Sequence, residues 1–290
     1  MTNELTPLKP LGTLDTIFEV HCVSDSDVRQ KHLDSALARK LPVCQVRRLR
    51  PGKLAIVASA PSVGDYVDTL KEWDGEIWGI NGAFAWMLHR GIKPNAFVGI
   101  DPEWFLKDYL INMPDDATYY LASQVHPDVF DHLNGKNVKL WFQADSEVKF
   151  PVGTVTVPGG STCLGRSIYL AVMMGWQDVH IFGGDSSFTH KTHVYGGELP
   201  TNFCFAKACG QEFKTTRTML TQACDLVVTV QNFPGTIAVH GWGLLQAMCE
   251  DVKQAGIGEL LEAEEAQQIR ATTRVERRLM KKQHRMLGAA

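Results

Sequence analysis

Two segments of the chain place small and hydroxyl-bearing residues directly after an apolar run or before an apolar helix. Residues 54–62 read LAIVASAPS, and residues 158–162 read PGGST ahead of an apolar stretch at 164–174. Small residues let a ligand approach the backbone, and the unpaired N–H groups of a following helix attract anions. Two such turns with acidic residues at neighbouring strand ends predict a nucleotide-using enzyme. The predicted phosphate and nucleotide contacts here are Ser59, Ser62, Gly159, Gly160, Ser161 and Thr162.

Two aspartates could hold a metal ion. Asp101 ends the run FVGID, and Asp185 ends the run IFGGD. Hard divalent cations prefer carboxylate oxygens, and nucleotide phosphates are usually handled with Mg²⁺, so both residues are predicted to ligate Mg²⁺ or to orient a sugar hydroxyl. The alternative is that each carboxylate only caps the turn or helix that follows it.

An asparagine and a histidine complete the candidate set. Asn81 follows Trp-Gly-Ile and precedes a glycine, so its amide could read a base or sugar edge, or could cap the next helix. Ser62 and Thr162 carry the same ambiguity between phosphate binding and capping. His193 ends the loop sequence THKTH and is predicted to act as a general base or as a hydrogen-bond donor to phosphate. Its spacing from His190 is weak evidence for a metal site.

The elements that must position these residues alternate between short apolar strands and helical segments from residue 53 onward. This order predicts an α/β fold, a Rossmann-like and mainly parallel sheet flanked by helices. In such a sheet ligands bind outside the carboxyl ends of the strands. Strands are predicted at 54–59, 76–81, 96–101, 118–122, 138–142, 154–157 and 179–182, and helices at 24–40, 63–73, 83–90, 127–133 and 162–174.

The remainder of the chain does not continue this regular alternation of strands and helices. Residues 203–207 and 212–216 predict a hairpin, followed by a helix at 218–230, a strand at 236–240 and a short helix from Leu244. Residues 259–286 have a helical composition, acidic at the start and basic at the end, which predicts either a helix that packs on a partner or oligomer mate, or a solvated extension. The predicted organisation is an N-terminal arm and helix at 1–50, a catalytic domain at 51–250 and a helical extension at 251–290.

Composition narrows the classes of protein. The chain has 290 residues, 44% hydrophobic and 21% charged, with a formal charge of -3. The overall charge gives no reason to expect nucleic-acid or membrane binding, which leaves only a local basic patch as an alternative. Seven scattered cysteines without a C-x-x-C pair favour a reducing compartment. No stretch has the length of a membrane span and the first residues lack an apolar signal region, so a cytoplasmic location is expected.

Several common motifs are missing from the sequence. It contains no nucleophile elbow of the G-x-S-x-G kind and no P-loop, and the first strand turn lacks the dinucleotide fingerprint G-x-G-x-x-G. Ordinary NAD enzymes and P-loop kinases are therefore disfavoured.

A family resemblance rests on several of these motifs in order. The segment VASAPS at 57–62, Asn81, the segment GIKPNAFVGID at 91–101, the Gly-Gly-Ser at 159–161, Gly175 and the Gly-Gly-Asp at 183–185 resemble the MptE-like 6-hydroxymethylpterin diphosphokinase family. The same pattern is similar to the catalytic domain of motility accessory factor glycosyltransferases, which are related in fold to bacterial sialyltransferases. The resemblance covers roughly residues 53–196, and Ala60 stands where the family pattern has glycine.

The resemblance implies a Rossmann-like nucleotide site. By motif position it assigns phosphate contacts to Ser62, Gly160 and Ser161, and a ligand or metal role to Asn81, Asp101 and Asp185. The implied activity is Mg²⁺-assisted diphosphoryl transfer from ATP to a hydroxyl-bearing small molecule. Two alternatives remain: a glycosyltransferase that uses a nucleotide-activated, CMP-linked sugar, and a non-catalytic nucleotide-binding module.

Overall fold

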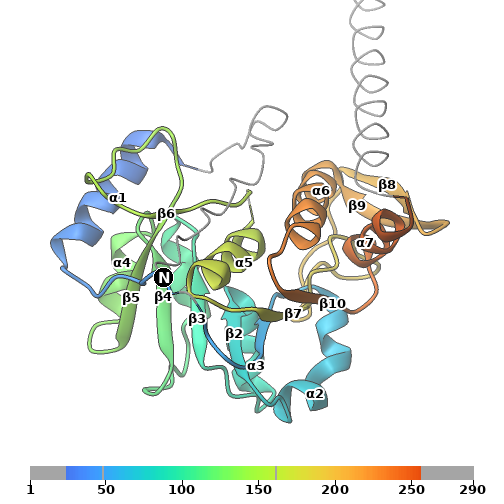
Figure 1. The fold of residues 1–290 in the computed structure, drawn as a ribbon, viewed down its shortest axis with the longest axis horizontal. Helices are drawn as coiled ribbons and strands as arrows, with labels where there is room; N and C mark the ends of the chain where they lie inside the picture. Colours follow the sequence, from blue (N-terminus) through green and yellow to red (C-terminus); the bar gives the residue numbers. More distant parts are fainter. Residues whose placement is uncertain (1–23, 48, 161, 256–290) are drawn as a thin grey trace, which may run out of the picture.

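A parallel sheet forms the centre of the molecule (Figure 1). The computed structural model describes residues 24–47, 49–160 and 162–255. Its strands follow the order β10-β7-β1-β2-β3-β4-β5-β6, and every neighbouring pair is parallel. The strands are β1 (Leu54–Val57), β2 (Glu76–Ile80), β3 (Ala96–Gly99), β4 (Thr118–Ala122), β5 (Asn137–Gln143), β6 (Thr156–Val157), β7 (Asp178–Phe182) and β10 (Thr236–His240).

The order of the strands reverses beside β1. The chain runs outward from β1 to β6, and β7 then returns to the other side of β1. Val57 of β1 lies level with Gly79 on one side and with Phe182 on the other, so the three strands end together. Ligands in open parallel sheets bind at such a reversal, outside the carboxyl ends.

Helices cover both faces of the sheet, which is why its central strands are apolar along their whole length. All four residues of β1 and of β3 are buried. The helices are α1 (Ser26–Ala38), the 3-10 helix η2 (Pro61–Tyr66), α2 (Val67–Lys71), α3 (Gly82–His89), the 3-10 helix η3 (Trp104–Tyr109), α4 (Pro127–His132), α5 (Cys163–Met173), α6 (Arg217–Gln231) and α7 (Leu244–Ala255).

The two ends of the sheet carry different additions (Figure 1). An antiparallel hairpin of β8 (Phe203–Ala208) and β9 (Gln211–Thr216) gathers with α6 and α7 beyond β10. At the opposite end, α1 packs against α4, and its Leu33 and Ala36 are fully buried in the main core. The N-terminal helix therefore belongs to the same hydrophobic core as the sheet.

The predicted fold class is confirmed, with local differences. The helix predicted at 63–73 is instead η2 followed by the short α2; Pro61 occupies the first position of η2, where its fixed φ suits a turn. The strand predicted at 154–157 shortens to Thr156–Val157, with Val155 56% exposed at the sheet edge. The segments at 1–12 and 259–286 lie outside the described residues, and the domain boundaries stay predictions. Among the helices that the structure describes, none has the length and apolarity of a membrane span.

Candidate functional site

A cavity of about 460 Å³ opens at the carboxyl edge of the sheet. Residues just after β1, β2, β3 and β7 form its wall, together with the last residue of β5, the start of α5 and one face of α6. This volume lies within the usual range for small-molecule sites. The predicted residues on the wall are Ser59, Asn81, Asp101, Thr162, Asp185 and His193. Ser62 does not line the cavity but bonds Asp185, which does. Ser161 lies outside the described residues.

Asp185 joins the ends of two strands. Its Oδ2 accepts a hydrogen bond of 3.0 Å from the Ser62 backbone N–H, and its Oδ1 accepts one from the Ser62 hydroxyl. Burial raises the pKa of Asp185 above the ordinary value of 3.8, and the two bonds from Ser62 oppose that rise. A Cβ at Gly243 would lie 2.6 Å from the Asp185 Cβ, so only glycine fits at this position of the loop after β10. Asp185 therefore holds the start of η2, which follows β1, and not the segment that follows Asp185 itself. The Ser62 hydroxyl bonds Asp185 and does not cap its own helix.

Asp101 forms a local turn and still faces the cavity. Its Oδ1 accepts a 3.0 Å hydrogen bond from the Glu103 backbone N–H, as in an Asx turn. Burial raises the pKa of Asp101, the bond from Glu103 lowers it, and the Glu103 charge raises it again. A cation beside this carboxylate would offset the cost of its charge, so the side chain fits a Mg²⁺ ligand. Within the described ranges no three His, Cys, Asp or Glu side chains form a metal site, so such an ion would also need phosphate or water oxygens.

Asn81 adopts a strained backbone conformation at the end of β2. Its φ is 46° and its ψ is -127°, a combination that L residues adopt rarely and that clusters at functional sites. Asn81 is the N-cap residue of α3, yet its side chain makes no capping hydrogen bond. A Cβ at Gly79 would lie 2.8 Å from the Phe84 Cα, so strand and helix meet in a sharp turn. Asn81 therefore lines the cavity with a side-chain amide that does not cap α3.

Cys163 is the thiol nearest to this asparagine. Its Sγ lies 3.9 Å from the Asn81 Oδ1 and 3.7 Å from the Val98 carbonyl oxygen. Burial raises the pKa of Cys163 to about 12, so the residue stays a neutral thiol at ordinary pH. A weak S–H donor, not a thiolate nucleophile, therefore stands beside Asn81.

The start of α5 shows why its small residues are needed. The Thr162 Oγ1 accepts a 2.9 Å hydrogen bond from the Gly165 N–H, which caps the helix. Gly159 has a φ of 121°, where other residues are strained. A Cβ at Gly160 would lie 2.5 Å from the Asp225 Oδ2 of α6. Packing and backbone conformation thus account for both glycines, and neither lies on the cavity wall.

A loop between β7 and β8 closes one side of the cavity. The Val194 N–H donates to the Ser59 carbonyl oxygen at 2.7 Å, which fixes the loop over the end of β1. The His193 ring stacks on Tyr195 with a centroid distance of 5.1 Å, and burial lowers the pKa of His193 below 6.5. A Cβ at Gly82 would lie 2.7 Å from the Tyr195 ring, so the loop rests directly on the start of α3.

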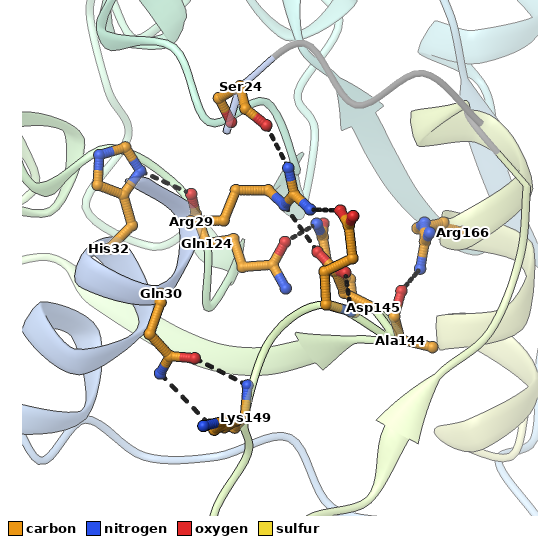
Figure 2. A network of polar contacts seen from close by, with 11 residues as sticks. Ser24, Arg29, Gln30, His32, Gln124, Ala144, Asp145, Lys149 and Arg166 are labelled. Carbon is orange, nitrogen blue, oxygen red and sulfur yellow. Dashed lines mark hydrogen bonds and ion pairs between the residues drawn. The ribbon is translucent and has the colours of Figure 1, made fainter. Parts of the chain in front are cut away.

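Sequence reasoning missed two arginines on the cavity wall. Arg29 comes from α1, and its Nε donates to the Asp145 Oδ2 at 2.7 Å (Figure 2). Arg166 comes from the first turns of α5, and its Nη1 donates to the Ala144 carbonyl oxygen at 3.0 Å (Figure 2). No local motif marks Arg29, because 116 residues separate it from Asp145. Arg166 could have been found from its place just after the PGGST turn.

The parallel sheet and the cavity at its strand reversal define a Rossmann-like α/β fold with a candidate small-molecule site. The chain belongs to the MptE-like family: the family model described as 6-hydroxymethylpterin diphosphokinase MptE-like matches residues 35–191. Membership of this family supports a transferase-like role. No curated protein matches the chain.

Two solved structures are similar to the chain. The MAf glycosyltransferase from Magnetospirillum magneticum AMB-1 is 15% identical with a TM-score of 0.58, over 82% of this chain and 43% of that one. The chain thus spans less than half of that protein, and the likeness shows a shared fold. A mammalian sialyltransferase solved with Gal-beta-1-3GalNAc-ortho-nitrophenol aligns at 8% identity and a TM-score of 0.39, over 81% of this chain and 97% of that one.

Proposed function

We propose that the protein is a Mg²⁺-assisted, nucleotide-dependent transferase that moves a diphosphoryl group from ATP to a hydroxyl group of a small molecule. The observation that carries this proposal is Asn81, whose strained turn directs an amide with no capping bond into the cavity. Such a backbone conformation costs about 1–3 kcal/mol, and strained residues of this kind cluster at active sites and ligand clamps. The description of the matching family supports the reaction type.

The cavity offers distinct positions for the parts of ATP. Ser59 and Asn81 follow β1 and β2, where a phosphate chain can reach both side chains and the backbone. Thr162, Cys163 and Leu164 at the start of α5 lie on the cavity wall, where the N-terminus of the helix can attract an anion. Ser62 acts indirectly in this scheme, because its hydroxyl and its N–H are already donated to Asp185.

In the proposed reaction the acceptor hydroxyl oxygen attacks the β-phosphorus of ATP. A new P–O bond forms to the acceptor, the bond from the β-phosphorus to the bridging oxygen of the α-phosphate breaks, and AMP leaves. The hydroxyl proton passes to His193, whose lowered pKa keeps the imidazole neutral and able to accept it at pH 7.

Asp101 is the proposed principal ligand for Mg²⁺. Asp185 lies on the same wall and can contribute the remaining lone pairs of its oxygens while it holds Ser62. Bound Mg²⁺ would neutralise phosphate charge, which is the main requirement of phosphoryl transfer.

We expect the protein to lie in the cytoplasm and its C-terminal segment to mediate any self-association.

A glycosyltransferase that uses a CMP-linked sugar is the second candidate. The similarity to the MAf glycosyltransferase fold extends over more of the chain than the family match does. In that reaction His193 would accept the proton of the acceptor hydroxyl or donate a proton to the leaving phosphate.

Product analysis separates these candidates. The full-length protein is incubated with Mg²⁺ and ATP, or with a CMP-linked sugar, in the presence of hydroxyl acceptors that include 6-hydroxymethylpterin. We expect acceptor-dependent AMP from ATP, and its loss in Asp101→Asn. Release of CMP without AMP would move the assignment to glycosyl transfer. Nucleotide binding without either product, unaffected by Asp101→Asn, would leave a non-catalytic binding module.

A further inference from the structure

The cavity extends well beyond the strands that carry the proposed phosphate contacts. Its wall includes Gln143, the last residue of β5, as well as Ser59 after β1. β5 lies four strand positions from β1, which corresponds to about 19 Å across the sheet. A ligand bound near β1 by its phosphates would therefore leave the β5 end of the cavity for another chemical group.

Two buried glutamines form the base of this end. The Gln143 Nε2 donates to the Gln124 Oε1, while the Gln143 Oε1 and the Gln124 Nε2 have no hydrogen-bond partner. Gln143 is 8% exposed and Gln124 is fully buried. Buried polar groups in native proteins nearly always have a partner, so an unpaired amide atom on a cavity wall points to a ligand contact.

Two residues of α1 lie at this end of the site: Arg29 on the cavity wall, and His32 against the backbone of Gln124. The Arg29 guanidinium donates to Asp145, Glu147 and the Ser24 carbonyl oxygen (Figure 2). The His32 ring contacts the Gln124 carbonyl oxygen at 3.0 Å, which ties α1 to the end of β4. Guanidinium groups only donate hydrogen bonds, so Arg29 supplies no acceptor, whereas Gln143 lines the cavity with an Oε1 that lacks a partner.

We infer that the β5 end of the cavity, here called the Gln143 subsite, recognises the edge of a nitrogen heterocycle through an N–H donated to the Gln143 Oε1. This inference rests on the proposed function. The heterocycle belongs either to the base of the nucleotide or to the acceptor, and both present the same N–H donor chemistry. The subsite selects the ligand, whereas the residues around β1 and β7 handle its phosphates.

Calorimetric titration of the full-length protein with three probes tests the inference: ATP, 6-hydroxymethylpterin and inorganic tripolyphosphate, each with Mg²⁺. In Gln143→Met we expect roughly tenfold weaker binding of one heterocycle, because its N–H then lacks an acceptor, and unchanged binding of tripolyphosphate. Weaker ATP binding assigns the subsite to the base, and weaker pterin binding assigns it to the acceptor. Gln177→Met is the control, because Gln177 directly precedes β7, at the amino end of the strands and away from the cavity. It should leave the binding of all three probes unchanged.

Gln143→Asn provides a second variant, because it keeps the amide but withdraws it by one methylene group. It should show the same selective loss, and it keeps the test valid if Gln143→Met does not fold. Unchanged affinities in both variants, or an equal loss for tripolyphosphate, would overturn the subsite. Failure of the unmodified protein to bind ATP or tripolyphosphate would instead refute the proposed function on which the inference rests.

Discussion

Asp185, which follows β7, accepts both hydrogen bonds that Ser62 of η2 can donate, from its backbone N–H and from its hydroxyl. The two residues are 123 positions apart in the chain, yet they lie where β7 and β1 end side by side. The contact fixes the turn after β1 at the edge of the cavity. An aspartate that the sequence predicts as a metal ligand therefore also organises the backbone on which the proposed phosphate contacts depend.

The first prediction concerns the coupling between these two residues. Ser62→Ala should lower the free energy of unfolding by about 1–2 kcal/mol at pH 7, because a buried carboxylate loses a charge-assisted hydrogen bond. The same change should cost less in an Asp185→Asn background. Urea unfolding of the four proteins gives the coupling energy, and additive effects would refute the role of the pair.

The cost of Ser62→Ala should also depend on pH. The pKa of Asp185 is raised in the folded protein, so the carboxylate begins to gain a proton at a pH above its unfolded value of 3.8. The hydroxyl of Ser62 stabilises the charged form, so its contribution is present at neutral pH and declines as pH falls through the folded pKa. Urea titrations of both proteins between pH 7 and pH 4 measure this decline.

A second prediction addresses the strained turn at Asn81. Asn81→Gly removes the amide but accepts the backbone conformation, whereas Asn81→Ala removes the amide and keeps the strain. Both variants should lose ATP affinity equally, while the alanine variant should be less stable than the glycine variant by about 1–3 kcal/mol. Thermal unfolding and ATP titration check the two effects separately. Full ATP binding by Asn81→Gly would show that the turn serves folding alone.

The third prediction concerns the loop that rests on α3. Gly82→Ala places a methyl group 2.7 Å from the Tyr195 ring, so this ring must move, and the His193 ring stacked on it is displaced. We expect KM for the acceptor to rise several-fold with a small change in stability. Gly64→Ala is the matched control, because its Cβ would meet Val194 at an ordinary 3.6 Å. Adding Tyr195→Ala to Gly82→Ala should restore KM, and no restoration would mean that the glycine acts elsewhere.

The pH dependence of turnover provides the fourth prediction. Burial lowers the pKa of His193 below 6.5, so the neutral base persists at pH 6.5 and is lost only in more acidic solution. The acidic limb of the kcat/KM profile should therefore lie below pH 6.5, and it should disappear in His193→Gln. The exposed His190 serves as the control, since His190→Gln should leave the limb in place. A limb retained in His193→Gln would assign the base to another group.

The sequence was most informative about strands and least informative about contacts between distant elements. Apolar runs such as the one at β1 predicted the parallel sheet, because both of its faces are covered and its central strands must be apolar throughout. The same logic correctly placed Asp101 and Asp185 at the carboxyl edge. Their hydrogen bonds could not be predicted, since the partner of Asp185 depends on which strands become neighbours.

The far end of the cavity was harder to foresee. Gln143 could be recognised as a strand-end residue, but its pairing with Gln124 follows from the register of β4 and β5. Arg29 reaches the site only because α1 packs its Leu33 and Ala36 into the core of the sheet. The strain at Asn81 is equally invisible in the sequence, because asparagine is a normal residue at the start of a helix.

The central claim is that the cavity at the carboxyl ends of β1, β2, β3 and β7 binds a nucleotide with Mg²⁺. Isothermal titration of ATP into the full-length protein, with and without Mg²⁺, tests it most directly. The account predicts binding at one site that Mg²⁺ strengthens, with that enhancement lost in Asp101→Asn. No detectable binding of ATP under either condition would contradict it.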